Sequence, residues 1–213
     1  MNQVEFEFRE KMVTMYIPSN GPSMWGSAND IQKHGYGNEG NFWVSDMVES
    51  LRHDTGIAVD VGAGYGLYPN LWANFLSFNK IVAIEPLVVG HEAILANAPK
   101  AEIYDYYLGD GMSDTTTLDS MNLDNVSVIK IDVEGAEFSV MRGAEKTLSR
   151  DKPIIYLELH SNCPIEILDL IQDLGYSYAT NNGSVTAEHF KSQWIRDQIQ
   201  NVKLFGEMMN EQI

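Results

Sequence analysis

Residues 57–66 read IAVDVGAGYG, and this stretch decides the fold class. Its first half is a short apolar run typical of a buried strand, and its second half contains Gly62, Gly64 and Gly66. Glycine has no Cβ, so the backbone can turn sharply there and approach a ligand closely. A second apolar run, residues 80–84, ends at Glu85. In a doubly wound sheet, an acidic residue at this place holds the hydroxyls of a ribose. The two features together predict a site for a nucleoside-containing cofactor.

The glycine spacing distinguishes between cofactors. A nicotinamide dinucleotide site has the pattern G-x-G-x-x-G, but Leu67 stands where the third glycine would be. The run is instead D-x-G-x-G-x-G from Asp60, and it resembles motif I of class I S-adenosylmethionine (SAM) methyltransferases, with Glu85 as the acidic residue of motif II. The alternatives are a glycine-rich turn of another α/β protein and a nicotinamide-dependent oxidoreductase, which the missing glycine opposes.

The resemblance implies which residues bind SAM. Its methionine and ribose portions would lie over the glycine-rich run, and its ribose hydroxyls would bind Glu85. The expected cofactor-binding residues of this part of the chain are Asp60, Gly62, Ala63, Gly64, Gly66, Glu85 and Pro86.

Apolar runs alternate with helical patterns along the chain. We expect strands at 57–61, 80–86, 101–108, 126–132, 153–160, 175–180 and 201–207, and helices at 42–51, 69–76, 88–97, 137–148, 165–174 and 187–198. This alternation predicts an α/β fold: a doubly wound, mostly parallel, seven-stranded Rossmann-like methyltransferase sheet. We expect one SAM-binding domain over residues 41–213. Residues 1–40 are predicted to be an N-terminal extension or lid that begins with a hairpin or irregular strand pair at 4–17.

A second block points to a particular family. Residues 128–143 read VIKIDVEGAEFSVMRG, and residues 156–160 read YLELH. The sequence resembles the FkbM-type methyltransferases, whose signature is a lysine-hydrophobe-aspartate strand end, then V-E-G-A-E, a helix with a glycine, and a later strand ending in glutamate near a histidine. The matching residues are Lys130, Asp132, Glu134, Gly135, Ala136, Glu137, Gly143, Glu158 and His160.

Three shorter elements extend this resemblance. Residues 108–110 match the family's L-G-D, residues 117–119 match its T-L-D, and Gly35, Tyr36 and Glu39 resemble a G-x-Y-E element. The chain departs from the family at Gly64, where asparagine is common, and in the short segment between Gly109 and Thr117. The resemblance implies that Gly109 and Asp110 bind the cofactor, with Asp110 facing the adenine amino group.

Acidic residues end several of the expected strands. Ligands of open parallel sheets bind beyond the carboxyl ends of the strands, and Asp132 and Glu158 end consecutive strands. We therefore expect Asp132, Glu158 and His160 to converge as the catalytic residues. One of them would be the base, because crowded carboxylates raise one another's pKa and histidine is a common base. Asp132 is assigned either to the methionine end of SAM or to the acceptor.

Other interpretations of this cluster stay open. Glu134 and Glu137 are typical of a helix N-terminus, where carboxylates only cap the helix. Lys130 is explained equally well as an ion-pairing residue, and His160 as a structural histidine. Carboxylates with one histidine would also suit Mg²⁺ or Mn²⁺. No spacing here is diagnostic of a metal, so no metal is predicted.

The composition of the chain argues against some classes of binding partner. The 30 acidic and 14 basic residues give a net charge of −16, which opposes binding to nucleic acid. The N-terminus lacks the pattern of a signal peptide and no apolar run has transmembrane length, so we expect a cytoplasmic protein without a membrane partner. The single cysteine, Cys163, excludes an intrachain disulfide and is interpreted as a structural thiol.

The sequence as a whole predicts a SAM-dependent methyltransferase. The family resemblance implies O-methylation of a sugar, a glycan or a small natural product. The alternative from another class is a non-catalytic SAM-fold protein that acts as a binding or assembly module.

Overall fold

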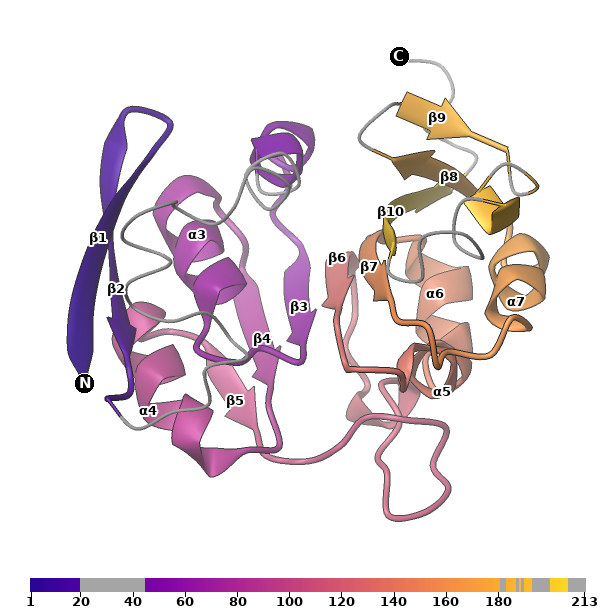
Figure 1. Ribbon diagram of the computed structural model, residues 1–213, viewed down its shortest axis with the longest axis horizontal. Coiled ribbons are helices and arrows are strands. Elements are labelled where there is room, and N and C mark those ends of the chain that lie inside the picture. The colour runs from indigo at the N-terminus through magenta and orange to yellow at the C-terminus, as the bar shows by residue number, and fades with distance from the viewer. Residues whose placement is uncertain (20–44, 181–182, 187, 189, 193–199, 207–213) are drawn as a thin grey trace. The chain divides into compact units, whose positions relative to one another are not determined.

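The computed structural model describes residues 1–19, 45–180, 183–186, 188, 190–192 and 200–206 (Figure 1). They belong to two compact units, one built from residues 1–56 and 62–105 and the other from residues 57–61 and 106–213. The predicted lid residues after 19, the G-x-Y-E element and the first residues of the expected helix 42–51 lie outside the described residues. Residues 45–50 are helical as predicted.

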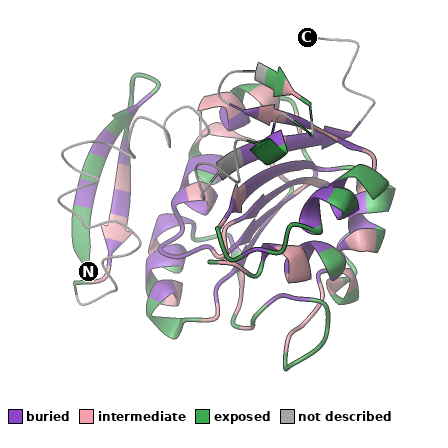
Figure 2. Ribbon diagram, turned by 45° about the vertical axis from the view of Figure 1, so that its right-hand side comes forward, coloured by how far each residue is buried: buried purple, intermediate pink, exposed green. Residues whose placement is uncertain are grey.

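The first unit begins with an antiparallel hairpin. Strand β1 (Asn2–Phe8) pairs with β2 (Lys11–Ile17), and alternate side chains of both strands are buried (Figure 2). This alternation follows from the two-residue repeat of a strand. The buried face packs with residues of the helical segments in one hydrophobic cluster that includes Leu67 and Leu71. The predicted hairpin is therefore present and contributes to the core of this unit.

The rest of the first unit carries the glycine-rich loop. Strands β4 (Lys80–Ile84) and β5 (Glu102–Tyr104) are parallel, and the unit contains helices α3 (Leu67–Phe75) and α4 (Val88–Asn97). Pro69 stands in the first turn of α3, where a missing N–H costs nothing. The Asn97 side chain bonds both backbone groups of Tyr16 and donates to the Tyr65 carbonyl at 2.7 Å. One amide at the end of α4 thus ties the hairpin to the glycine-rich loop.

The second unit contains three parallel strands followed by antiparallel ones. Strands β3 (Ile57–Val61), β6 (Val126–Ile131) and β7 (Ile154–Leu159) are parallel. Strand β10 (Gln200–Gly206) runs antiparallel to β7 and to β8 (Tyr176–Thr180), which also pairs with β9 (Gly183–Val185). Its helices are α5 (Glu137–Arg142), α6 (Glu145–Asp151) and α7 (Ile167–Asp173), with a 3₁₀ turn, η2 (Asp119–Met121).

These elements confirm the predicted α/β class with a mostly parallel central sheet. Within the described residues that sheet has eight strands rather than seven, because β9 forms a short hairpin with β8. The expected helix 137–148 is two helices. They separate at Gly143, where a Cβ would lie 1.8 Å from the Gly109 carbonyl oxygen. None of the helices in the described ranges is both long and apolar enough to cross a membrane.

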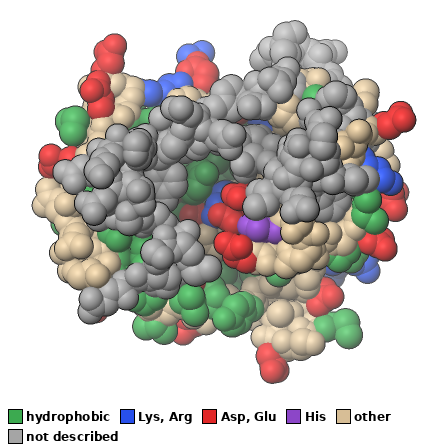
Figure 3. Space-filling model, viewed as in Figure 1, with side chains coloured by type: hydrophobic (Ala, Val, Ile, Leu, Met, Phe, Trp, Pro, Cys, Tyr) green, Lys and Arg blue, Asp and Glu red, His purple; other side chains and the backbone are tan. Residues whose placement is uncertain are grey.

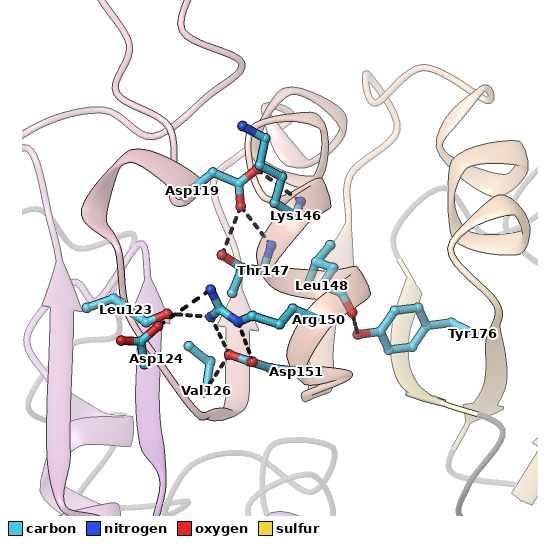
Figure 4. Close-up of polar contacts among 10 residues, drawn as sticks. All are labelled: Asp119, Leu123, Asp124, Val126, Lys146, Thr147, Leu148, Arg150, Asp151 and Tyr176. Carbon is cyan, nitrogen blue, oxygen red and sulfur yellow. Dashed lines mark hydrogen bonds and ion pairs between the residues drawn. The ribbon is translucent and has the colours of Figure 1, made fainter.

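Asp119 caps the N-terminus of α6 from a distant segment of the chain. The residue before this helix, Ala144, makes no side-chain cap bond. Instead the Asp119 carboxylate accepts the backbone N–H groups of Lys146 and Thr147 at 3.0 and 2.8 Å (Figure 4). The Thr147 hydroxyl donates to the same carboxylate at 2.8 Å. Because Asp119 lies 25 residues or more before the helix in sequence, this cap is a tertiary contact.

At the other end of α6, Arg150 and Asp151 join the helix to the start of β6. The Asp151 carboxylate accepts the Val126 N–H at 2.9 Å, and the Arg150 guanidinium donates to the Leu123 carbonyl and to Asp151 (Figure 4). The hydrogen bond from Arg150 is the main cause that lowers the pKa of Asp151, so this carboxylate stays ionised. Both ends of α6 are thus fixed by charge-assisted hydrogen bonds.

We expect the Asp119→Ala substitution to lower the free energy of unfolding by about 1 to 2 kcal/mol, the usual cost of removing a helix cap. Denaturant unfolding would measure it. The matched control is Asp124→Ala. The Asp124 carboxylate is 93% exposed and its ion pair with Arg150 is long, at 3.7 Å, so its removal should change the free energy of unfolding little. Equal effects of the two substitutions would contradict the capping role.

Candidate functional site

The glycine-rich loop of the first unit is held by backbone bonds to the end of β4. The N–H groups of Gly62 and Ala63 both donate to the Ile84 carbonyl, at 2.9 and 3.1 Å. All three glycines of the loop have positive φ. At Gly66, with φ of 78°, a Cβ would also lie 3.0 Å from the Ile94 backbone, so only glycine fits without displacement.

Glu85 is buried and bound to the loop itself. Only 3% of the residue is exposed. One carboxylate oxygen accepts the Gly64 N–H at 2.9 Å and the other accepts the Leu87 N–H at 2.8 Å. The role of this carboxylate as the acceptor of the ribose hydroxyls stays a prediction. The predicted ribose residue therefore has a further role that the sequence analysis missed, which is to hold the loop.

Helix α4 adds two contacts to this arrangement. Gly90 packs so closely that a Cβ there would lie 2.4 Å from the Gly64 carbonyl oxygen. The ring of His91 bonds the Glu85 carbonyl oxygen through Nε2 at 2.7 Å. Pro86 is half-buried between Glu85 and the exposed Leu87. The loop and the acidic strand end of the first unit are thus one hydrogen-bonded assembly.

In the second unit, Lys130 lies between two carboxylates. Residues Asp60 and Lys130 are paired in the register of β3 and β6, and Lys130 Nζ is 3.2 Å from Asp60 Oδ1. The same ammonium lies 3.5 Å from Asp132 Oδ2. Asp60 is completely buried and Lys130 is 6% exposed. Lys130 is therefore an ion-pairing residue, and the assignment of Asp60 to the cofactor stays a prediction.

The predicted catalytic residues come together at the ends of β6 and β7. Ile131 is paired with Leu157, so the next residues along the two strands are Asp132 and Glu158. Asp132 Oδ1 lies 4.0 Å from His160 Nε2. Glu134 Oε2 lies 3.2 Å from the same nitrogen, and Glu137 Oε1 lies 2.7 Å from Nδ1 on the other side of the ring. Figure 3 shows acidic side chains gathered around a histidine beside a basic side chain.

The pKa values of Glu158 and His160 are both raised in this environment. Burial, and then the charge of Asp132, raise the pKa of Glu158. Burial lowers the pKa of His160, but the hydrogen bond and charge of Glu137, with the charges of Glu134 and Asp132, outweigh it and the net shift is upward. Both directions agree with an excess of negative charge around one imidazole.

The same side chains could hold a cation. One donor atom each of Asp132, Glu158 and His160 lies within 4.8 Å of the others, and all three residues are half-buried. Two carboxylate oxygens and an imidazole nitrogen are a suitable donor set for Mg²⁺ or Mn²⁺.

The L-G-D and T-L-D elements have a structural explanation. A Cβ on Gly109 would lie 2.7 Å from Thr115 Oγ1 and 2.8 Å from Ser139 Oγ, and the Asp110 N–H donates to that Ser139 oxygen. Asp119 donates its backbone N–H to Gly143. Gly109 of the L-G-D element and Gly143, which contacts the T-L-D element, therefore allow close packing of neighbouring segments. The Asp110 side chain is exposed and accepts the Met112 N–H, and its role at the adenine stays a prediction.

Sequence reasoning missed one contact of this site, between Glu137 and His160. Glu137 stands at the start of α5, and it accepts the N–H of Gly135 in the turn before the helix at 2.9 Å. Its contact with His160 connects segments 23 residues apart, which local spacing does not reveal. Cys163 is buried, and burial with the charge of Glu137 raises its pKa to about 12, so it is not a reactive thiolate.

Comparison with solved structures defines the class of fold. A TehB-like SAM-dependent methyltransferase from Corynebacterium glutamicum is similar with a TM-score of 0.53 and 10% identity over 86% of this chain and 94% of that one. An rRNA methylase from Streptococcus thermophilus gives a TM-score of 0.53 and 13% identity over 80% of this chain and 98% of that one. At such identities the likeness shows the fold, which is that of Rossmann-like methyltransferases.

A second comparison concerns the family rather than the fold. Residues 112–178 match the methyltransferase FkbM domain. A structure of methyltransferase FkbM from Methylobacillus flagellatus has a TM-score of 0.54 and 20% identity over 71% of this chain, and the chain spans 44% of that structure's length. These two findings confirm the predicted resemblance to FkbM-type methyltransferases. No curated protein matches the sequence at a significant level.

Proposed function

We propose that the protein is a SAM-dependent methyltransferase that transfers the methyl group to a hydroxyl of a sugar, a glycan or a small natural product. The observation that carries the proposal is the Glu85 carboxylate, which is buried at the end of β4 and bonded to Gly64 and Leu87. It offers the ribose hydroxyls of SAM fixed acceptors beside a loop that lets a ligand approach the backbone. The methyltransferase fold and the match to the FkbM domain support this assignment.

The chemistry requires placement and a proton acceptor. The hydroxyl oxygen attacks the methyl carbon, the carbon–sulfur bond breaks, S-adenosylhomocysteine leaves and the hydroxyl proton must be removed. The sulfonium needs no activation, so the enzyme supplies alignment and a base. We assign proton removal to the group formed by Asp132, Glu158 and His160, with His160 Nε2 as the acceptor. Asp110 is assigned to the adenine amino group.

The acceptor class rests on charge and on the family. The net charge of −16 disfavours a nucleic-acid acceptor, although one structure with a similar fold is an rRNA methylase. FkbM-type resemblance favours a sugar or natural-product hydroxyl. A non-catalytic module that only binds SAM is the alternative from another class.

A second candidate for activation of the hydroxyl is a divalent cation. The donor atoms of Asp132, Glu158 and His160 lie within 4.8 Å of one another. Ligand atoms about 2.1 Å from a Mg²⁺ or Mn²⁺ ion are roughly 3 to 4.2 Å apart, so a small movement of these side chains would close the site. A bound cation would make the acceptor hydroxyl more acidic.

Isothermal titration should detect binding of SAM and of S-adenosylhomocysteine, and no binding of NAD. The Glu85→Ala substitution should weaken SAM at least about tenfold, since hydrogen bonds to a charged group contribute roughly 1.5 to 3 kcal/mol each. Glu102→Ala, which removes a half-exposed carboxylate of the same unit, is the control. If neither SAM nor S-adenosylhomocysteine binds, the methyltransferase assignment is wrong; if Glu85→Ala binds SAM normally, the ribose assignment is wrong.

Turnover should be measured with labelled SAM against a panel of glycans and small hydroxyl compounds. We expect His160→Ala to lower kcat about 10²- to 10⁴-fold with unchanged SAM affinity, the range for loss of a general base. The exposed His53 provides the control variant His53→Ala. Unchanged kcat in His160→Ala would remove His160 as the base, and SAM binding without turnover of any acceptor would favour the non-catalytic module.

The cation candidate is tested with Mn²⁺ alone, followed by electron paramagnetic resonance of the free ion. If the candidate is right, the protein binds one ion, Asp132→Asn loses it, and Asp173→Asn at the exposed end of α7 keeps it. Absence of saturable binding, or equal binding by both variants, would leave proton removal by the side chains themselves.

A further inference from the structure

Glu137 is the most deeply buried carboxylate beside His160. The residue has no exposed surface, and its Oε1 contacts His160 Nδ1 at 2.7 Å. The other oxygen, Oε2, has no hydrogen-bond partner within the described residues. Burying a carboxylate with one oxygen unpaired is costly, and a buried ion pair is weak evidence for stability. The position therefore calls for an explanation other than stability.

A bond to the turn before α5 explains only part of it. Glu137 is the first residue of α5 and accepts the Gly135 N–H at 2.9 Å. A hydrogen bond of this kind forms equally well at the surface, where the carboxylate stays hydrated and has no desolvation cost. The contact that requires burial is the one with His160, whose side chain is 12% exposed.

The contact determines which ring nitrogen carries the proton. An ionised carboxylate only accepts hydrogen bonds, so Nδ1 must be the donor. In the protonated ring both nitrogens donate, Nδ1 to Glu137 and Nε2 toward Glu134 Oε2 at 3.2 Å. The neutral ring keeps the proton on Nδ1, because its contact with the buried Glu137 is shorter than that of Nε2 with the exposed Glu134, and the lone pair is then on Nε2. Neutral histidine side chains in water prefer the opposite tautomer, with the proton on Nε2. Glu137 therefore imposes the less common form.

Two residues with positive φ make this arrangement possible. Glu134 has φ of 56° and Gly135 has φ of 108°. The turn places Glu134 against Nε2 and Glu137 against Nδ1 of the same imidazole, so the ring lies between two carboxylates from one short segment. The ring is consequently fixed in orientation as well as in tautomer.

We infer that Glu137 is a positioning residue, which holds His160 in the Nδ1–H tautomer so that the lone pair of Nε2 is directed to the acceptor hydroxyl. The inference rests on the proposed methyltransferase function. It applies whether Nε2 removes the proton itself or binds a cation, because both roles need an unprotonated Nε2.

The tautomer can be read without any substrate. Long-range proton–nitrogen correlation spectra of the full chain with isotope-labelled histidine, recorded where the imidazole is neutral and assigned with His160→Gln, should show the Nδ1–H form. Glu137→Leu should shift His160 toward the Nε2–H form. Glu137→Gln keeps an acceptor oxygen and should retain the Nδ1–H form. Glu134→Gln, which changes the carboxylate at the other nitrogen, is the matched control and should also retain it.

Activity then separates positioning from a structural role. We expect Glu137→Leu to lower kcat about 10- to 100-fold with unchanged SAM affinity, the range for carboxylates that orient a functional histidine, and Glu137→Gln to recover most of it. An Nε2–H tautomer in the unmodified protein overturns the inference. So does an unshifted tautomer or an unchanged kcat in folded Glu137→Leu. If the leucine variant does not fold, the spectrum of the unmodified protein and kcat of Glu137→Gln still decide. Failure of SAM binding would instead overturn the proposed function.

Discussion

The register of β6 with its neighbouring strands β3 and β7 is the constraint on which the acidic site of the second unit depends. It pairs Asp60 with Lys130, so a fully buried carboxylate meets a nearly buried ammonium at 3.2 Å. Removing Lys130 would deprive the buried Asp60 carboxylate of its ion-pair partner, and breaking a buried pair in this way costs about 3 to 5 kcal/mol. A shift of one residue would also turn every side chain of the strand to the opposite face. The pair therefore favours this register of β3 with β6, and the register of β6 with β7 places Asp132 next to Glu158.

Several carboxylates of this protein bind backbone N–H groups. Glu85 holds the glycine-rich loop through Gly64, and Asp119 caps α6 from a distant segment. Glu137 accepts the Gly135 N–H and fixes His160. In each case a charged acceptor satisfies N–H groups that a turn or a helix start leaves unpaired. The acidic composition of the chain thus has structural uses beyond solubility.

Much of the fold was predictable because apolar periodicity is a local property. The buried strands β6 and β7 are nearly continuous apolar runs, as expected for parallel strands covered on both faces (Figure 2). The division of the helix near Gly143 was not predicted, and the close approach of the Gly109 backbone there is a tertiary contact that local spacing does not reveal. The short strand β9 was missed because three residues carry too little pattern. The convergence of Asp132, Glu158 and His160 was predictable from strand ends alone.

The sequence by itself determined the class of fold, the glycine-rich loop with its acidic partner, and the charged strand ends, because all of these depend on residue type and short spacing. Only the tertiary structure decided what each carboxylate contacts. Glu137 looks like an ordinary cap in the sequence, and its distance of 2.7 Å from His160 exists only once α5 packs against the end of β7. The tautomer of a histidine depends on the partner of each ring nitrogen, and that partner lies in another segment of the chain.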